Sequence, residues 1–195
     1  MDDPSAVEET VAVLAGGGTV VLPTDTVYGL AALPSREGAT ADLFALKDRA
    51  ADHPLAVLVA DLDQALELVE VTVPDVSRWM AELWPGPLTI VLRRSAVSAG
   101  LDLGGDAVTI GVRCPDHQFV RALAAEVGPI ATTSANRTGQ PTPLTAIEAA
   151  ASLSGAVDLV VDGGPAGKAA STVVDASTEP WRVLRSGAIT PDRLS

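Results

Sequence analysis

The sequence predicts an α/β protein, a single domain with a twisted mixed sheet flanked by helices. Short apolar runs typical of buried strands alternate irregularly with segments whose apolar residues recur at helical spacing. Hydrophobic residues make up 47 % of the 195 residues but aromatic residues only 3 %, so the core must consist mainly of Val, Leu, Ala and Ile. Because no low-complexity linker or internal repeat interrupts the chain, we expect one domain over residues 1–195.

The first half of the chain predicts helices and short strands. Val7, Val11 and Leu14 recur at helical spacing, and the three glycines at 16–18 end this first helix. The apolar run at 55–60 is bounded by a proline and an aspartate, which is typical of a strand buried on both faces. The expected elements are, in order, a helix over 4–15, a strand over 19–24, a helix over 38–48, a strand over 55–60, and helices over 61–69 and 74–83.

The second half predicts the remaining strands. A Pro-Gly-Pro turn at 85–87 precedes a β-branched strand over 88–94. In the strand over 108–113, alternation places Thr109, Gly111 and Arg113 on one face and the three apolar residues on the other. The elements expected next are a helix over 116–127, a strand over 129–133, a loop over 134–143, a helix over 145–153, and strands over 157–161, 171–175 and 181–185.

The charge balance restricts the classes of partner. Thirteen Lys and Arg residues against 25 Asp and Glu residues give a net charge of −12 and a pI near 4.4. A field of this sign repels polyanions, so a broad surface that binds duplex nucleic acid is disfavoured. A small anion pocket is not excluded, because a phosphate group needs only a few focused cations and backbone N–H groups.

Cysteine usage and hydropathy indicate the compartment. Cys114 is the only cysteine, so no internal disulfide can form and nothing points to an oxidising environment. The N-terminus is acidic, and no apolar run approaches the roughly 18 residues that a membrane-spanning helix needs. We therefore expect a cytoplasmic protein.

Two segments gather polar side chains next to a predicted strand. Residues 23–30, PTDTVYGL, contain two hydroxyls, a carboxylate and the only tyrosine before a glycine. They fit either local capping of a turn by Asp25 and Thr26 or a ligand site. The hydroxyls and amide of residues 132–136, TTSAN, crowd the end of a strand, where open α/β sheets place their ligand crevice. A plain cap and loop is the alternative there.

Three basic residues are candidates for binding an anion. Lys47 and Arg49 follow a predicted helix, so they are either solvated charges favoured by its dipole or a phosphate clamp. In a clamp, Lys supplies a point charge, and Arg supplies a fork, that is, a planar guanidinium whose paired N–H groups can bind two oxygens at once. Arg113 lies near the end of a buried strand, where it must meet either a carboxylate of the protein or an anionic ligand.

Several familiar sites do not match the sequence. Residues 163–168, GGPAGK, have a glycine spacing one residue short of a phosphate loop, and Ala169 stands where Ser or Thr should hold Mg²⁺. Cys114 and His117 have the spacing of half a metal site, but His53 is the only other histidine, so we predict no metal site. No nucleophile elbow occurs.

The order of the motifs is more specific than any one of them. The segments concerned are GGGTVVLPTDTVYGL, LKDRAADHPLAVLV, LWPGPLTIVL, VTIGVRCPDH, PIATTSANRTGQPTP, STVVD and WRVLRSG. Together, from about Val11 to Arg185, they resemble the YrdC-like family of threonylcarbamoyl-AMP synthases, in its short, single-domain form. The resemblance implies the YrdC-like fold and a nucleotidyltransferase that makes threonylcarbamoyl-adenylate and pyrophosphate from L-threonine, bicarbonate or CO₂, and ATP. The product serves the threonylcarbamoyladenosine modification at position 37 of tRNA.

The resemblance also implies roles for individual residues. Lys47 and Arg49 of the K-x-R motif would be catalytic and bind the nucleotide phosphates. The L-threonine site would contain Thr26, Tyr28, Arg113, Thr132 and Ser171. The nucleotide site would also contain His53, Thr109, Ser134, Asn136, Thr142 and Arg185. Leu58 departs from the family pattern, because some members carry at this position a histidine that contacts threonine.

The implied reaction needs no covalent protein nucleophile. Positioning by hydroxyls and amides, with charge compensation by Lys47, Arg49, Arg185 and a Mg²⁺ bound through the ATP phosphates, would suffice. The expected partners are the small substrates and the downstream tRNA threonylcarbamoyl-transferase machinery, with no membrane and at most weak direct binding of tRNA.

Two other functions stay open. One is an RNA-binding module of the same fold, against which the net charge of −12 argues. The other is a module that forms a carbamoyl-adenylate from carbamoyl phosphate. The chain lacks the zinc-finger cysteines and the acylphosphatase-like segment of proteins with that activity.

Overall fold

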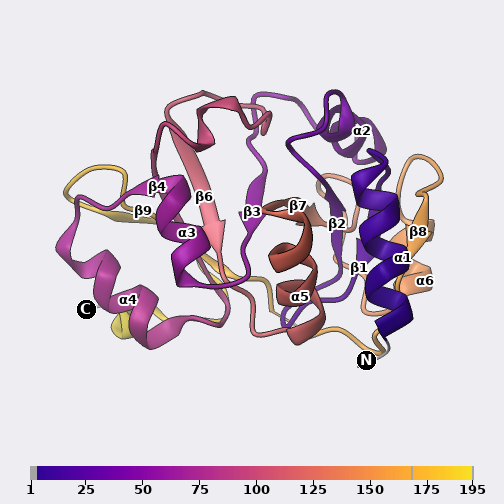
Figure 1. The fold of residues 1–195 in the computed structure, drawn as a ribbon. Coiled ribbons are helices and arrows are strands. Elements are labelled where there is room, and N and C mark those ends of the chain that lie inside the picture. The colour runs from indigo at the N-terminus through magenta and orange to yellow at the C-terminus, as the bar shows by residue number, and fades with distance from the viewer. Residues whose placement is uncertain (1–3, 168, 195) are drawn as a thin grey trace.

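The computed structural model describes residues 4–167 and 169–194. Its ten strands form one mixed sheet flanked by helices, as the sequence predicts (Figure 1). The strands are β1 (Val20–Leu22), β2 (Gly29–Ala32), β3 (Ala56–Leu58), β4 (Val69–Glu70), β5 (Leu88–Arg94), β6 (Thr109–Arg113), β7 (Ile130–Ser134), β8 (Leu159–Val160), β9 (Thr172–Asp175) and β10 (Arg182–Arg185). The helices are α1 (Pro4–Ala15), α2 (Ala39–Leu46), α3 (Leu62–Leu68), α4 (Pro74–Leu83), α5 (Gln118–Val127), α6 (Ala146–Ala151), and the short 3₁₀ turns η1 (Ser98–Gly100) and η2 (Pro191–Arg193).

Strand order brings distant segments together at the centre of the sheet. The order is β10-β9-β5-β6-β3-β7-β2-β1-β8, and β4 pairs with β5 outside this path. The pairs β1 with β8, β3 with β6, and β5 with β9 are parallel, whereas the other pairs are antiparallel. The two central strands β6 and β3 therefore run between β5 and β7.

Two strands differ from the sequence prediction. Residues 29 and 30 were expected to belong to a strand-to-turn junction, but together with Ala31 and Ala32 they form β2 between β1 and β7. Glycine and alanine have weak strand propensity, so pairing with two neighbours decides the conformation of this segment. Val69 was expected at the end of a helix and instead begins β4, where it pairs with Arg94 of β5.

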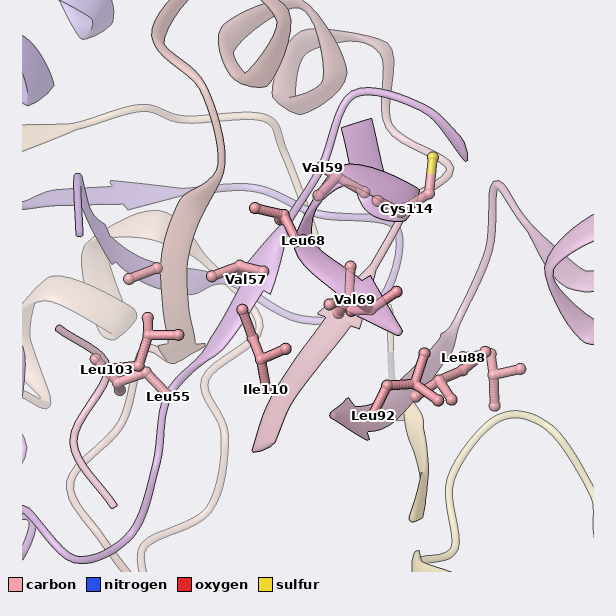
Figure 2. Packing of buried hydrophobic residues seen from close by; sticks show 14 of the residues in the cluster. Leu55, Val57, Val59, Leu68, Val69, Leu88, Leu92, Leu103, Ile110 and Cys114 are labelled. Atoms are coloured by element: carbon pink, nitrogen blue, oxygen red, sulfur yellow. The ribbon is translucent and has the colours of Figure 1, made fainter. Parts of the chain in front are cut away.

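The hydrophobic core lies on both faces of the sheet. In β3 and just beyond it, Val57 and Val59 belong to the larger cluster, whereas Leu58 and Ala60 belong to a second cluster with α1 and α5. Since successive side chains of a strand point to opposite faces, the two clusters lie on opposite sides of β3. Figure 2 shows the larger cluster, in which side chains of β3 and β6 meet those of the α3–β4 segment.

The C-terminal segment is anchored to α4. Trp79 is fully buried and its ring meets Trp181 edge-on, with the ring centroids 5.0 Å apart. The indole N–H of Trp79 also donates to the carbonyl oxygen of Leu194 at 3.1 Å. These contacts hold β10 and the residues after it against the body of the protein.

Within residues 4–167 and 169–194, no helix is long and apolar enough to cross a membrane.

Candidate active site

A cavity of about 560 Å³ opens on the face of the sheet that carries Leu58. Most of the site residues expected from the sequence line it, and they come from β6, β7, β10 and four loops. These residues are Thr26, Arg49, Thr109, Arg113, Thr132, Ser134, Thr142, Ser171 and Arg185. Four others do not line it: Tyr28, Lys47, His53 and Asn136.

The hollow lies over a row of four paired residues, of which the central two are small. Val91 of β5 is paired with Gly111 of β6, Gly111 with Ala56 of β3, and Ala56 with Thr132 of β7. All four residues line the cavity. Because the central two have little or no side chain, the sheet surface is low there, and larger polar side chains can stand around it. The predicted alternation of the strand at 108–113 is confirmed, because Thr109, Gly111 and Arg113 all face this cavity.

Arg113 is buried and already holds three partners. Its Nε donates to the carbonyl oxygen of Gly86 at 3.0 Å, and its Nη1 donates to the hydroxyl of Thr26 at 2.9 Å. Its Nη2 donates to a carboxylate oxygen of Asp25 at 2.5 Å. The sequence left open whether Arg113 meets a carboxylate or a ligand; the structure gives it the carboxylate and also a place in the cavity wall. Burial lowers the pKa of Arg113, and the charge of Asp25 opposes that shift.

The turn before β2 is capped by a residue other than those expected. The hydroxyl of Thr24 accepts from the backbone N–H groups of Thr26 and Val27 at 3.1 and 3.2 Å and donates to the carbonyl oxygen of Val27 at 2.6 Å. Local capping by Asp25 and Thr26 was therefore wrong. Their side chains reach Arg113 instead, which frees the turn to present Thr26 to the cavity. Asp25 is a site residue that the sequence analysis missed, although its position beside Thr26 was visible.

Arg185 and Ser171 form a second polar group. The guanidinium of Arg185 donates to the carbonyl oxygen of Ser171 at 3.1 and 2.9 Å and to its hydroxyl at 3.0 Å. The hydroxyls of Ser171 and Thr89 lie 2.9 Å apart and share a hydrogen bond. Thr89 also lines the cavity, and sequence analysis missed it. Its signal in the sequence is a polar residue two positions before Val91 in β5, because residues two apart in a strand share a face and Val91 also lines the cavity.

The helix before the K-x-R motif ends in a turn that separates its two cations. The backbone N–H of Asp48 donates to the carbonyl oxygen of Ala45, and that of Arg49 donates to the carbonyl oxygen of Phe44. Asp48 adopts a left-handed conformation with φ of 50°, as the residue after a helix end does in a Schellman motif. This reversal sends Lys47 inward and Arg49 towards the cavity.

Arg49 and Arg185 supply positive charge that no carboxylate of residues 4–167 and 169–194 neutralises through an ion pair. Arg49 donates to the carbonyl oxygens of His53 and Pro54, both at 3.0 Å, and lies in the cavity wall. Neither arginine forms an ion pair with a carboxylate in the described part of the chain. Burial lowers the pKa of each guanidinium, and the charge of Arg185 lowers that of Arg49 further. The cavity is thus locally cationic in a protein whose net charge is −12.

Lys47 lies behind the cavity wall. Only 2 % of the residue is exposed, and its ammonium donates to the carbonyl oxygens of Ser134 and Asn136, the latter at 2.6 Å. Burial, with a smaller contribution from the charge of Arg49, lowers the pKa of Lys47 to about 8. The phosphate clamp expected from the sequence is therefore divided, with only its arginine in the cavity.

The other three residues outside the lining have different positions. The side-chain amide of Asn136 donates to the carbonyl oxygens of Arg137 and Gln140, at 3.0 and 2.6 Å, and so supports the loop after β7. His53 is exposed and contributes its carbonyl oxygen to Arg49. Tyr28 is fully buried in the core and does not line the cavity, so its place in the threonine site stays a prediction.

The hydroxyl of Tyr28 holds a loop. It donates to the carbonyl oxygen of Gly164 at 2.6 Å and accepts from the backbone N–H of Gly163 at 3.0 Å. This is part of the segment excluded as a phosphate loop; its last residue, Lys168, lies outside the described residues.

Cys114 is a buried free thiol. No group of three or more His, Cys, Asp or Glu side chains able to hold a metal ion occurs among the described residues.

The chain is similar to known proteins over most of its length. The family model Sua5/YciO/YrdC, described as "Telomere recombination", matches residues 12–187. A protein of Mycobacterium leprae is 39 % identical over 191 residues, which cover 97 % of this chain and 86 % of the relative. The threonylcarbamoyl-AMP synthase of Bacillus subtilis is 36 % identical over 197 residues, covering 99 % of this chain and 56 % of the relative.

A solved structure shows the same fold. The crystal structure of P. abyssi Sua5 complexed with L-threonine superposes with a TM-score of 0.86 at 33 % sequence identity, covering 98 % of this chain and 57 % of that protein. The chain thus spans little more than half the length of the B. subtilis and P. abyssi proteins. With the family model covering most of its length and the cavity residues lying within the matched range, the chain belongs to the Sua5/YciO/YrdC family.

Proposed function

We propose that the protein is a threonylcarbamoyl-AMP synthase. The observation that carries the proposal is a cavity in which two unpaired guanidiniums and several hydroxyls surround the Arg113–Asp25 pair. This arrangement suits one substrate with a polyphosphate and another with a carboxylate and a hydroxyl. The names of the B. subtilis and P. abyssi relatives, and the L-threonine bound to the latter, support it.

The proposal divides the cavity between the two substrates. Thr26, Arg113, Thr132 and Ser171 would bind L-threonine, with the guanidinium of Arg113 on its carboxylate. Two of the five N–H groups of Arg113 remain beyond its three protein contacts and can serve that carboxylate. Asp25 would hold the fork in place. The nucleotide would lie against Arg49, Thr109, Ser134, Thr142 and Arg185.

The chemistry then depends on positioning and charge compensation. The amine nitrogen of threonine attacks the carbon of bicarbonate, or of CO₂ derived from it, and water leaves overall. An oxygen of the resulting carbamate attacks the α-phosphorus of ATP while the bond to pyrophosphate breaks. Arg49 and Arg185 would offset the negative charge that gathers on the phosphate oxygens. Since the described residues offer no cluster of metal ligands, Mg²⁺ would enter on the phosphates as part of the substrate.

The proposal also includes a downstream partner and a cellular compartment. Threonylcarbamoyl-adenylate would pass to a tRNA threonylcarbamoyl-transferase in the cytoplasm, where the free thiol of Cys114 stays reduced. Direct binding of tRNA would be weak, because the net charge of −12 repels a polyanion. Neither the RNA-binding nor the carbamoyl-adenylate alternative has an observation in its favour beyond the shared fold.

Product analysis tests the proposal directly. Incubation with ATP, bicarbonate and isotopically labelled threonine is expected to give an adenylate whose mass carries the label, together with one pyrophosphate for each adenylate. Omitting threonine should stop pyrophosphate release. Release supported by carbamoyl phosphate in place of threonine and bicarbonate would contradict the proposal and favour the carbamoyl-adenylate alternative.

Replacing Tyr28 by phenylalanine tests whether it belongs to the threonine site. The variant loses the hydrogen bonds to Gly163 and Gly164, so we expect the free energy of unfolding to fall by about 1 kcal/mol. The KM for threonine should stay within about twofold of the unmodified value, because a factor of two is below 0.5 kcal/mol. Thr26→Val is the matched control, since its hydroxyl contacts Arg113 in the cavity wall, and it should raise that KM. An equal rise in both variants would place Tyr28 in the threonine site.

A further inference from the structure

Among the described residues, every hydrogen bond of the Lys47 ammonium goes to one loop. Its acceptors are the carbonyl oxygens of Ser134 and Asn136, the side-chain oxygen of Asn136 at 3.4 Å and the hydroxyl of Ser134 at 3.5 Å. An ammonium has three donors; two make close bonds to the carbonyl oxygens, and the third has the two longer contacts within reach. All the acceptors lie on one loop, which extends from the end of β7 to Gln140 and which we call the 134–140 loop. Every acceptor is uncharged.

The same lysine also holds the loop through its backbone. The carbonyl oxygen of Lys47 accepts from the backbone N–H and the hydroxyl of Thr138, both at 3.1 Å. The loop is thus tied at Ser134 and Asn136 by the side chain and at Thr138 by the main chain. Two carbonyl oxygens that turn towards the same buried point repel each other unless a hydrogen-bond donor lies between them, and the ammonium of Lys47 is that donor here.

The loop borders the cavity at the end where the nucleotide is proposed to bind. Ser134 lines the cavity and Thr142 follows two residues after the loop ends. Lys47 does not line the cavity, whereas Arg49 does. A buried lysine without a carboxylate partner is costly, which its lowered pKa of about 8 reflects. The hydrogen bonds of the ammonium to the loop offset part of this cost.

We propose that Lys47 is a positioning residue, an internal cation that orders the 134–140 loop before the nucleotide binds, and that Arg49 alone of the K-x-R motif contacts phosphate. The inference rests on the nucleotide site proposed above. In a protein without the ammonium, the loop would be ordered in only a fraction of molecules. The apparent dissociation constant for ATP then rises by the inverse of that fraction, while the chemistry in the bound complex is preserved.

Comparison of Lys47→Met with Arg49→Met tests this division of roles. Without any nucleotide, hydrogen exchange at the amides of Asn136 and Thr138 is expected to speed up about tenfold or more in Lys47→Met and to stay unchanged in Arg49→Met. Saturating ATP should restore the protection in Lys47→Met. Its KM for ATP should rise at least tenfold with kcat within about threefold, whereas Arg49→Met should lose kcat as well as affinity.

A different pattern would overturn the inference. If the loop of nucleotide-free Lys47→Met exchanges as slowly as in the unmodified protein while kcat falls as in Arg49→Met, then Lys47 acts on the phosphates directly. The exchange arm contains no nucleotide. A protein that never binds ATP would therefore refute the proposed function and leave the structural role of Lys47 to be judged by exchange alone.

A measurement on the unmodified protein covers the case in which Lys47→Met fails to fold. The chain has only two lysines, Lys47 and Lys168, so nitrogen resonances of their ammonium groups are simple to assign. At about pH 6.5, well below its pKa of about 8, the Lys47 ammonium should give a slowly exchanging signal without nucleotide. That signal should keep its position when ATP is added. A scalar coupling from the ammonium to phosphorus, or its appearance only with ATP, would show direct phosphate contact.

Discussion

Replacing Arg113 by methionine is expected to produce the largest loss of activity of any single change in the cavity. The variant loses the fork proposed for the threonine carboxylate. Truncating one member of a buried charged contact costs about 2–5 kcal/mol, so kcat/KM for threonine should fall by about 30-fold to several thousand-fold. The KM for ATP should change much less, because Arg49 and Arg185 are retained. Steady-state kinetics with each substrate varied in turn measures both effects.

The same substitution should destabilise the fold. Asp25 is 13 % exposed in its side chain and would lose its only ion-pair partner in the described residues. Breaking a buried ion pair by removing one member costs about 3–5 kcal/mol, which chemical denaturation can detect. The double variant Asp25→Asn/Arg113→Met removes the stranded charge and should recover part of this stability without recovering threonine turnover. A parallel recovery of both would mean that Arg113 serves the fold and not the substrate.

Arg113→Lys separates the fork from the charge. Lysine keeps a cation near Asp25 but cannot make two parallel hydrogen bonds to a carboxylate. The KM for threonine should therefore rise with the KM for ATP little changed. An equal rise in both constants would contradict the assignment of Arg113 to the threonine carboxylate.

Replacing Gly187 by alanine is expected to damage the site from a position outside it. A Cβ at this glycine would lie 2.5 Å from the carbonyl carbon of Ser171 and still closer to the carbonyl oxygen of Ala170. These are backbone atoms, so the 186–189 segment must move away. It would lose the hydrogen bond from the N–H of Ala188 to Ala170 at 3.0 Å and that from the N–H of Ile189 to Thr172 at 2.9 Å.

The expected results for Gly187→Ala are a loss of stability and a loss of activity together. Forcing atoms into packed surroundings costs about 1–3 kcal/mol. The guanidinium of Arg185 is hydrogen-bonded to Ser171, whose backbone lies against Gly187. Displacing these two residues should lower kcat/KM by about tenfold or more, which is the equivalent of one charged hydrogen bond. Gly100→Ala is the control, because a Cβ there meets nothing within 4 Å and should change neither quantity. Unaltered kinetics in Gly187→Ala would show that the Arg185–Ser171 contact tolerates movement of the segment.

The sequence determined the fold class and much of the cavity surface. Apolar runs bounded by breakers place β3 and β5, and helical spacing places α1 and α4, because burial requires those periods. Strict alternation in β6 fixes which face Thr109, Gly111 and Arg113 share. These features depend only on the period of a helix or strand, which fixes the face on which each residue of that element lies.

Tertiary structure decided everything that depends on a partner distant in sequence. β2 has weak strand propensity and becomes a strand because β1 and β7 satisfy its hydrogen bonds on both sides. Asp25 pairs with Arg113, 88 positions away, because strand order brings β6 near the turn before β2. Likewise Lys47 and Arg49 are two positions apart and appear equivalent in the sequence. The left-handed turn at Asp48 and the carbonyl oxygens of the 134–140 loop send one inward and leave the other in the cavity, since a buried ammonium goes where acceptors can replace its water.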